Sequence, residues 1–194
     1  LGLENIHVFD FDIVEAHNIA NQVFSQADIG RPKVEALRDI VKAHTGLEIT
    51  IYNERVDGSQ KLGDVVFLLT DTMSSRKEIW QKAIRFKVAT KLMIETRMGV
   101  DQGRVYVVNP TRMAQVKGWE ETLYDDDVAE VSACGSTISV GPTAEFLSGL
   151  AVWQLIRWLN IETGKTVDGG VSDTLDHEIL FCLRPPTMLI RQFD

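Results

Sequence analysis

The chain has 194 residues, a length that fits one domain with a sizeable hydrophobic core. Its formal net charge of -8 argues against nucleic acid or an anionic membrane as the main partner. Cys134 and Cys182 are too few for a disulfide framework, and no Cys-x-x-Cys pair is present to hold zinc. No apolar run reaches the roughly 18 residues of a membrane span and no signal peptide is visible, so we expect a cytoplasmic protein.

A predicted strand and the polar arm that follows it open the chain. The apolar run from Ile6 to Phe9 is typical of a buried strand and ends at Asp10. An acidic residue at the end of a strand is where nucleotide-binding α/β folds bind a ribose hydroxyl. The polar arm carries Asp12, His17, Asn18, Asn21 and Gln22, and the start of a helix follows at Gly30, Pro32 and Lys33. Carboxylates, amides and a lysine in this order suit a nucleoside triphosphate.

Strands and helices alternate through the first half of the chain. The predicted elements are a helix at Pro32–His44, strands at Leu47–Tyr52 and Val65–Leu69, a helix at Ser74–Phe86, and strands at Thr90–Arg97 and Gly103–Val108. The unbroken apolar run at Val65–Leu69 is typical of a central parallel strand. This alternation predicts an α/β sheet with crossover helices.

The second half contains a long connection, one apolar helix and a final pair of strands. We predict an irregular crossover loop at Thr111–Thr137, which includes an acidic run at Asp125–Asp127. The helix at Thr143–Asn160 is apolar nearly all round, so we expect it to be buried on several sides, partly at a subunit interface. Two alternating segments, His177–Leu183 and Thr187–Phe193, predict an antiparallel pair.

The motif D-x-D-x-V-x-x-x-N-x-x-x-Q followed by D-I-G-x-P-K resembles the adenylating domain of the ubiquitin-activating enzymes, whose bacterial members are the ThiF, MoeB and HesA proteins. The resemblance implies one domain over 1–194. Its fold would be Rossmann-like α/β, with a mostly parallel sheet, helices on both faces and a C-terminal antiparallel strand pair. It also implies ATP and Mg²⁺ as cofactors, a small β-grasp protein of the ubiquitin-like or sulfur-carrier type as partner, and a homodimer. The chain departs from many of these relatives in lacking their zinc site.

The resemblance assigns the nucleotide site to Asp10, Asp12, Asn18, Asn21, Gln22 and Lys33. Asp10 would bind the ribose, although a strand-terminal aspartate that caps a turn is the alternative. Lys33 would give the phosphates a cation at a helix N-terminus, where free N–H groups also favour anions. The alternative for Lys33 is a solvated surface lysine.

Asp71 is the second strong point of the resemblance. It follows an apolar strand, so it should lie at the carboxyl edge of the sheet, where open α/β folds bind ligands. The resemblance implies a carboxylate linked to Mg²⁺ beside the triphosphate. The alternative is an N-cap for the next helix. Relatives usually have Asp-Asn here, whereas this chain has Thr72 after Asp71, and Arg76 one turn on could face phosphate or form a surface salt bridge.

Asn21 is the main departure from the motif. Relatives place an arginine directly before the glutamine, where it contacts the triphosphate, but here Asn21 precedes Gln22. Losing that cation weakens charge stabilisation during adenylyl transfer. Either another cation substitutes or the chain is a weakened adenylating subunit that serves as a scaffold.

Cys134 lies between the acidic run and the apolar helix, where some relatives form a thioester or persulfide. A thiolate nucleophile needs a lowered pKa, and the alternative is a small packed residue.

A dinucleotide-binding enzyme is a remaining alternative to an adenylating enzyme, since Asp10 alone also fits NAD.

Leu1 and Gly2 are typical of the end of a helix, so we expect a strand and a glycine-rich phosphate loop upstream of them.

Overall fold

The computed structural model describes residues 3, 5–128, 140–164 and 174–193. The chain divides into two compact units, Leu1–Val56 and Asp57–Asp194. Each unit has a sheet of its own, with two strands in the first and five in the second. The prediction of a single domain stays a prediction.

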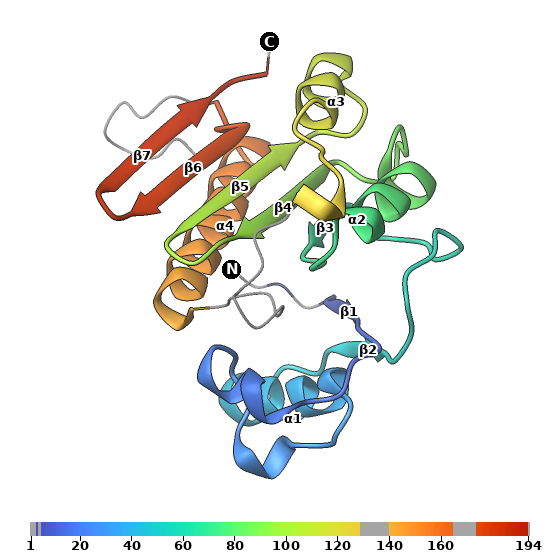
Figure 1. Cartoon of the computed structure of the whole chain (residues 1–194). Helices are drawn as coiled ribbons and strands as arrows, with labels where there is room; N and C mark the ends of the chain where they lie inside the picture. Colours follow the sequence, from blue (N-terminus) through green and yellow to red (C-terminus); the bar gives the residue numbers. More distant parts are fainter. Residues whose placement is uncertain (1–2, 4, 129–139, 165–173, 194) are drawn as a thin grey trace. The chain divides into compact units, whose positions relative to one another are not determined.

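The first unit is a parallel strand pair joined through a helix (Figure 1). Its elements are β1 (His7–Phe9), the 3-10 helices η1 (Ala16–Ala20) and η2 (Gln26–Asp28), α1 (Lys33–Thr45) and β2 (Thr50–Tyr52). Parallel strands need a long crossover, and the polar arm with α1 provides it. The helix, predicted at Pro32–His44, begins after Pro32 and ends at Gly46, whose φ of 74° is the left-handed conformation that glycine tolerates.

The polar arm is fixed to the start of α1 by backbone hydrogen bonds and a small core. Val14 N–H donates to the Arg31 carbonyl at 2.8 Å, and Gly30 N–H donates to the Val14 carbonyl at 2.9 Å. Val14 is buried together with Phe24 and Ala36. The arm is therefore a folded part of the unit, held between β1 and α1.

The second unit is a five-stranded sheet in the order β3-β4-β5-β6-β7. Its elements are β3 (Val65–Leu68), α2 (Met73–Ile79), the π-helical turn η3 (Trp80–Ile84), β4 (Leu92–Met98), β5 (Gln102–Val108), α3 (Met113–Glu120), η4 (Asp126–Val128), α4 (Gly141–Glu162), β6 (Glu178–Leu183) and β7 (Pro186–Arg191). The Rossmann-like α/β class is confirmed, together with the antiparallel strand pair at the C-terminus.

Parallel pairing is found in β1–β2 and in β3–β4. Antiparallel pairing begins earlier than the sequence indicated, because β4–β5 and β5–β6 are antiparallel as well as β6–β7. The physical reason is the connection between β4 and β5, the segment 99–101, which is too short for the crossover that parallel strands require.

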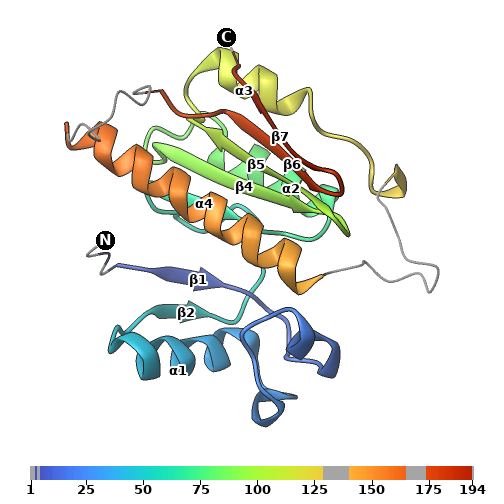
Figure 2. The ribbon, with the colours of Figure 1, turned by 90° about the vertical axis from the view of Figure 1, so that its left-hand side faces the viewer.

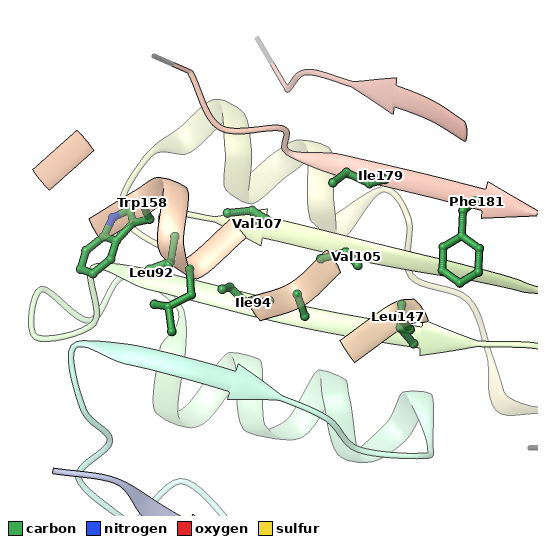
Figure 3. Close-up of a cluster of buried hydrophobic side chains, with 10 residues drawn as sticks. Leu92, Ile94, Val105, Val107, Leu147, Trp158, Ile179 and Phe181 are labelled. Atoms are coloured by element: carbon green, nitrogen blue, oxygen red, sulfur yellow. The ribbon is translucent and has the colours of Figure 1, made fainter. Parts of the chain in front are cut away.

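Helices cover both faces of this sheet, as predicted (Figure 2). On one face, α4 packs Leu147 and Trp158 against apolar residues of the central strands (Figure 3). These strand residues are Leu92, Ile94, Val105, Val107, Ile179 and Phe181. On the opposite face, α3 brings Trp119 against Trp80, with ring centroids 4.4 Å apart. Successive residues of β4 alternate between the faces, as expected for a strand with both faces covered.

One prediction about the second half of the chain is wrong. The segment Thr111–Thr137 was expected to be irregular, but it contains α3, whose pattern is weakened by Gly118. A Cβ at Gly118 would lie 2.4 Å from the Phe193 ring, so packing rather than helix propensity selects glycine there. In the single chain, Phe146 and Trp153 of α4 are 42% and 50% exposed, so burial of this helix partly at a subunit interface stays a prediction.

Glycine packing under α4 gives a test of this core. A Cβ at Gly103 would lie 2.5 Å from the ring of Phe181, which is buried, whereas a Cβ at Gly149 of α4 meets nothing within 4 Å. We expect Gly103→Ala to lower the free energy of unfolding by about 1–3 kcal/mol, because overpacking strains a filled core. The matched control Gly149→Ala should raise it by about 0.5–1 kcal/mol. Urea unfolding measures both, and equal midpoints for the two variants would contradict this packing.

Candidate functional site

The polar arm of the first unit surrounds a pocket of about 300 Å³. The residues that line it are Phe11, Asp12, Ile13, Glu15, His17, Asn18 and Lys33. The pocket therefore brings together three of the predicted nucleotide ligands, Asp12, Asn18 and Lys33. Its volume is at the lower end of the range found for small-molecule sites.

Lys33 and Asp12 form the charged wall of the pocket. The Lys33 ammonium donates to Asp12 Oδ2 at 2.9 Å, and the backbone N–H of Lys33 donates to the Asp12 carbonyl at 2.9 Å. The lysine side chain is 17% exposed and the aspartate side chain 52%. Lys33, the first residue of α1, is thus a partly buried cation held by Asp12. The alternative of a solvated surface lysine is wrong.

Asp10 lies directly after β1 and holds the turn into the arm. Its Oδ1 accepts the backbone N–H of Asp12 at 2.8 Å, the hydrogen bond of an Asx turn. Among the described residues no hydrogen bond to Oδ2 is recorded. One carboxylate oxygen therefore shapes the turn, and within the described residues the other accepts no hydrogen bond.

Asn18, Asn21 and Gln22 come from the 3-10 helix η1 and the residues after it. Asn18 is 4% exposed, and its Oδ1 accepts the backbone N–H of Glu15 at 2.9 Å, so the side chain also holds this helix. The backbone N–H groups of Asn21 and Gln22 both donate to the Asn18 carbonyl, at 3.2 and 2.8 Å. Neither Asn21 nor Gln22 lines the pocket.

Four lining residues were not chosen from the sequence as ligands: Phe11, Ile13, Glu15 and His17. Phe11 and Ile13 are 58% and 52% exposed, although they are apolar. They alternate with Asp10, Asp12 and the buried Val14. That alternation at the end of a predicted strand was the signal that could have identified an apolar wall beside the polar groups.

Asp71 lies in the second unit, at the carboxyl end of β3, and is exposed. The following helix is capped by Thr72, whose hydroxyl accepts the backbone N–H of Ser75 at 3.3 Å. The alternative of Asp71 as the N-cap is therefore wrong. Its carboxylate is left at the sheet edge, beside the start of α2.

The acidic run of the crossover segment binds the start of the same helix. Asp126 accepts the backbone N–H groups of Met73 and Ser74 at 2.5 and 3.1 Å, and Lys77 donates to Asp125 at 2.7 Å. Hydrogen bonds from Ser74 and Met73 hold the pKa of Asp126 below its usual value. The run Asp125–Asp127 was predicted only as part of a loop, because nothing in the sequence links it to a helix so far away.

Arg76 has neither of the two roles that the sequence suggested. It is 4% exposed, its Nε lies 2.6 Å from Glu95 Oε1, and its Nη2 donates to the Thr96 carbonyl at 3.2 Å and to the carbonyl of Thr70. Burial lowers the pKa of Arg76, and the Glu95 carboxylate opposes that shift. The guanidinium is thus bound within the fold, and both a surface salt bridge and a phosphate contact are wrong.

The two cysteines and possible metal ligands are the remaining candidates for chemistry. Cys134 lies outside the described residues, so its role as a nucleophile stays a prediction. Cys182 is a free, partly buried thiol in β6. Within the part of the chain that the structure describes, no group of three or more His, Cys, Asp or Glu side chains could hold a metal ion. Across the same residues, no helix combines the length and apolarity needed to cross a membrane.

Solved structures share this fold at low sequence identity. Escherichia coli MccB with MccA-N7isoASN has a TM-score of 0.71 and 15% identity, with 99% of this chain and 58% of that chain covered. E. coli MccB with ATP has a TM-score of 0.65 and 14% identity, with 99% and 57% covered. PaaA has a TM-score of 0.64 and 16% identity, with 96% and 63% covered. The chain therefore spans about three fifths of the length of these proteins.

No curated protein matches the sequence. A family model does match it, over residues 1–175, which include the whole first unit and most of the second. The model is that of the ThiF family, and this chain belongs to that family.

Proposed function

We propose that this protein uses ATP to adenylate a carboxylate. The observation that carries the proposal is the pocket in which Lys33, Asp12 and Asn18 meet between the end of β1 and the start of α1. Two solved structures of one structural neighbour support it, since MccB has been solved with ATP and with N-formylated MccA. The substrate would be the carboxyl terminus of a peptide or of a small β-grasp protein of the ubiquitin-like or sulfur-carrier type.

The chemistry of the first unit fits a nucleoside triphosphate. Asp10 keeps Oδ2 for a ribose hydroxyl while Oδ1 fixes the turn. Lys33 gives a cation at a helix N-terminus, a place that favours phosphate. Asn18 gives a buried amide, and the exposed side chain of Gln22 adds a second amide nearby along the chain. Asp12 would orient the Lys33 ammonium before the nucleotide binds.

Mg²⁺ fits the exposed carboxylate of Asp71. Mg²⁺ usually takes one or two carboxylates, and phosphate oxygens and water complete its octahedron. A single protein carboxylate at the sheet edge is therefore a sufficient protein ligand for Mg–ATP. Bound Mg²⁺ would offset the negative charge of the phosphates, and Asp71 would hold the ion in position.

The reaction would proceed by in-line attack. A carboxylate oxygen of the substrate forms a bond to the α-phosphorus, the bond from that phosphorus to its bridging oxygen breaks, and pyrophosphate leaves. Lys33 and Asp10 would hold the two ends of the nucleotide, so that catalysis comes from positioning and charge stabilisation. A later transfer to Cys134 would form a thioester with release of AMP. A cytoplasmic homodimer remains part of the proposal.

Asn21 supports a second candidate function, a scaffold subunit with weakened adenylation. It stands where relatives carry a phosphate-binding arginine, and it lies outside the pocket lining. Arg76, which the sequence offered for a phosphate contact, is bound to Glu95. ATP–pyrophosphate exchange distinguishes an active adenylating enzyme from a scaffold subunit with weakened adenylation.

Two lysines of α1 provide a matched test. Lys33 lines the pocket, whereas Lys42 is 59% exposed and pairs with Glu48. Lys33→Met should reduce ATP–pyrophosphate exchange about tenfold or more, because a charge-assisted contact is worth roughly 1.5–3 kcal/mol. Lys42→Met should leave exchange within about twofold of the wild type, since exposed ion pairs contribute little. Equal exchange in both variants would remove Lys33 from the site, and a wild type that exchanges no pyrophosphate with any carboxyl-terminal substrate would reject adenylation.

Restoring the arginine of the family tests the departure at Asn21. Asn21→Arg would add a guanidinium beside the phosphates, and one such contact is worth about 2–4 kcal/mol, or roughly thirtyfold or more in rate. Ala20→Arg is the control, because it adds the same charge at the neighbouring exposed residue. Pyrophosphate exchange is measured at saturating ATP. A large gain for Asn21→Arg alone indicates a weakened enzyme, whereas no gain in an active wild type indicates that another cation acts there.

A further inference from the structure

Arg76 contacts the backbone on both sides of Asp71. Its Nη2 donates to the carbonyl of Thr70, the residue before Asp71. Its own backbone N–H donates to the carbonyl of Thr72, the residue after Asp71, at 3.2 Å. The turn that carries the Asp71 carboxylate is therefore held at each end by one residue of α2.

The same guanidinium connects this turn to the neighbouring strand. Arg76 Nε lies 2.6 Å from Glu95 Oε1, and Nη2 also donates to the Thr96 carbonyl at 3.2 Å. Both partners belong to β4, which pairs in parallel with β3. A planar guanidinium has donors in a fixed geometry, so it can fix several acceptors relative to one another where a flexible ammonium cannot.

Glu95 does not depend on Arg76 alone. It is fully buried, and its carboxylate also accepts Arg97 Nε at 3.0 and 3.1 Å and Trp119 Nε1 at 3.1 Å. Arg97 is held independently, because its guanidinium donates to the Thr122 carbonyl at 2.7 Å and lies 4.4 Å from the centre of the Tyr106 ring. What distinguishes Arg76 from Arg97 is that its guanidinium donates to the carbonyls of Thr70 and Thr96.

Charges around Arg76 also involve Asp71. Burial lowers the pKa of Arg76, Glu95 raises it, Arg97 lowers it, and Tyr124 and Asp71 raise it. Two buried guanidinium groups share the single carboxylate of Glu95. The exposed carboxylate of Asp71 is thus a further anion that interacts with the buried cation.

We propose that Arg76 is a positioning residue that fixes the Asp71 carboxylate for Mg–ATP without contacting the nucleotide. This inference rests on the proposed function, because it takes Asp71 as the Mg²⁺ ligand. Its effect should appear in the part of ATP affinity that depends on Mg²⁺. Residues that orient a metal ligand typically change metal affinity by about 10- to 100-fold when they are replaced.

The test is ATP binding by calorimetry, with and without Mg²⁺. Arg76→Lys and Arg97→Lys both keep a cation beside Glu95, but only the first removes the bond to Thr70. We expect Arg76→Lys to reduce the Mg²⁺-dependent gain in ATP affinity about tenfold and to leave binding without Mg²⁺ unchanged. Arg97→Lys should keep the gain. Equal effects of the two variants would overturn the positioning role.

A double variant separates positioning from general destabilisation. Asp71→Asn should remove the Mg²⁺-dependent gain, and adding Arg76→Lys to it should cause no further loss, since Arg76 acts through Asp71. A double variant that binds ATP more weakly than Asp71→Asn alone would mean that Arg76 acts elsewhere. If Arg76→Lys does not fold, Arg76→Gln replaces it, because this variant places no buried cation at residue 76. Its shorter side chain also cannot reach the Thr70 carbonyl, so we expect the same loss of the Mg²⁺-dependent gain in ATP affinity. A wild type that binds no ATP rejects the proposed function as well, whereas a normal Mg²⁺-dependent gain in both Arg76 variants rejects only this inference.

Discussion

The buried carboxylate of Glu95 is the interaction on which one side of the second unit depends. It has no exposed surface, and a buried charge is tolerated only when cations and hydrogen-bond donors replace water. Arg76 comes from α2, Arg97 from β4 and Trp119 from α3, so three elements must dock before the charge is satisfied. If one of these partners were lost, the Glu95 carboxylate would remain buried with too few hydrogen bonds and ion pairs. The contacts therefore stabilise one another cooperatively.

The two faces of the five-stranded sheet therefore have different physical roles. The face under α4 is apolar, and Leu147, Leu155 and Trp158 stabilise it by removing apolar surface from water. The opposite face combines large aromatic side chains with directional polar contacts. Because those contacts have fixed geometry, that face can hold the exposed turn at Asp71 in one conformation, which burial of apolar surface alone would not specify.

Local signals predicted much of the first unit and part of the site. Gly46 ends α1 and Lys33 begins it, because turns and helix ends depend on residues close together in the chain. Asp71 was assigned to a strand end from the apolar run before it, and that placement is confirmed. The roles of Arg76 and Asp126 could not be predicted. Their partners Glu95 and Ser74 are distant in sequence, and no periodic pattern encodes such contacts.

The sequence by itself determined the ThiF motif, the alternation of strands and helices, and the residue types available for nucleotide chemistry. These follow from local spacing, which sets secondary structure and the order of polar groups. Tertiary structure decided which groups meet. In the folded chain, Lys33 pairs with Asp12, and the buried Arg76 pairs with Glu95. Asp126, rather than Asp71, accepts hydrogen bonds from backbone N–H groups at the start of α2. The physical reason is that a charged side chain can be solvated, paired or buried with equal local propensity, and only the packing of distant segments selects among these states.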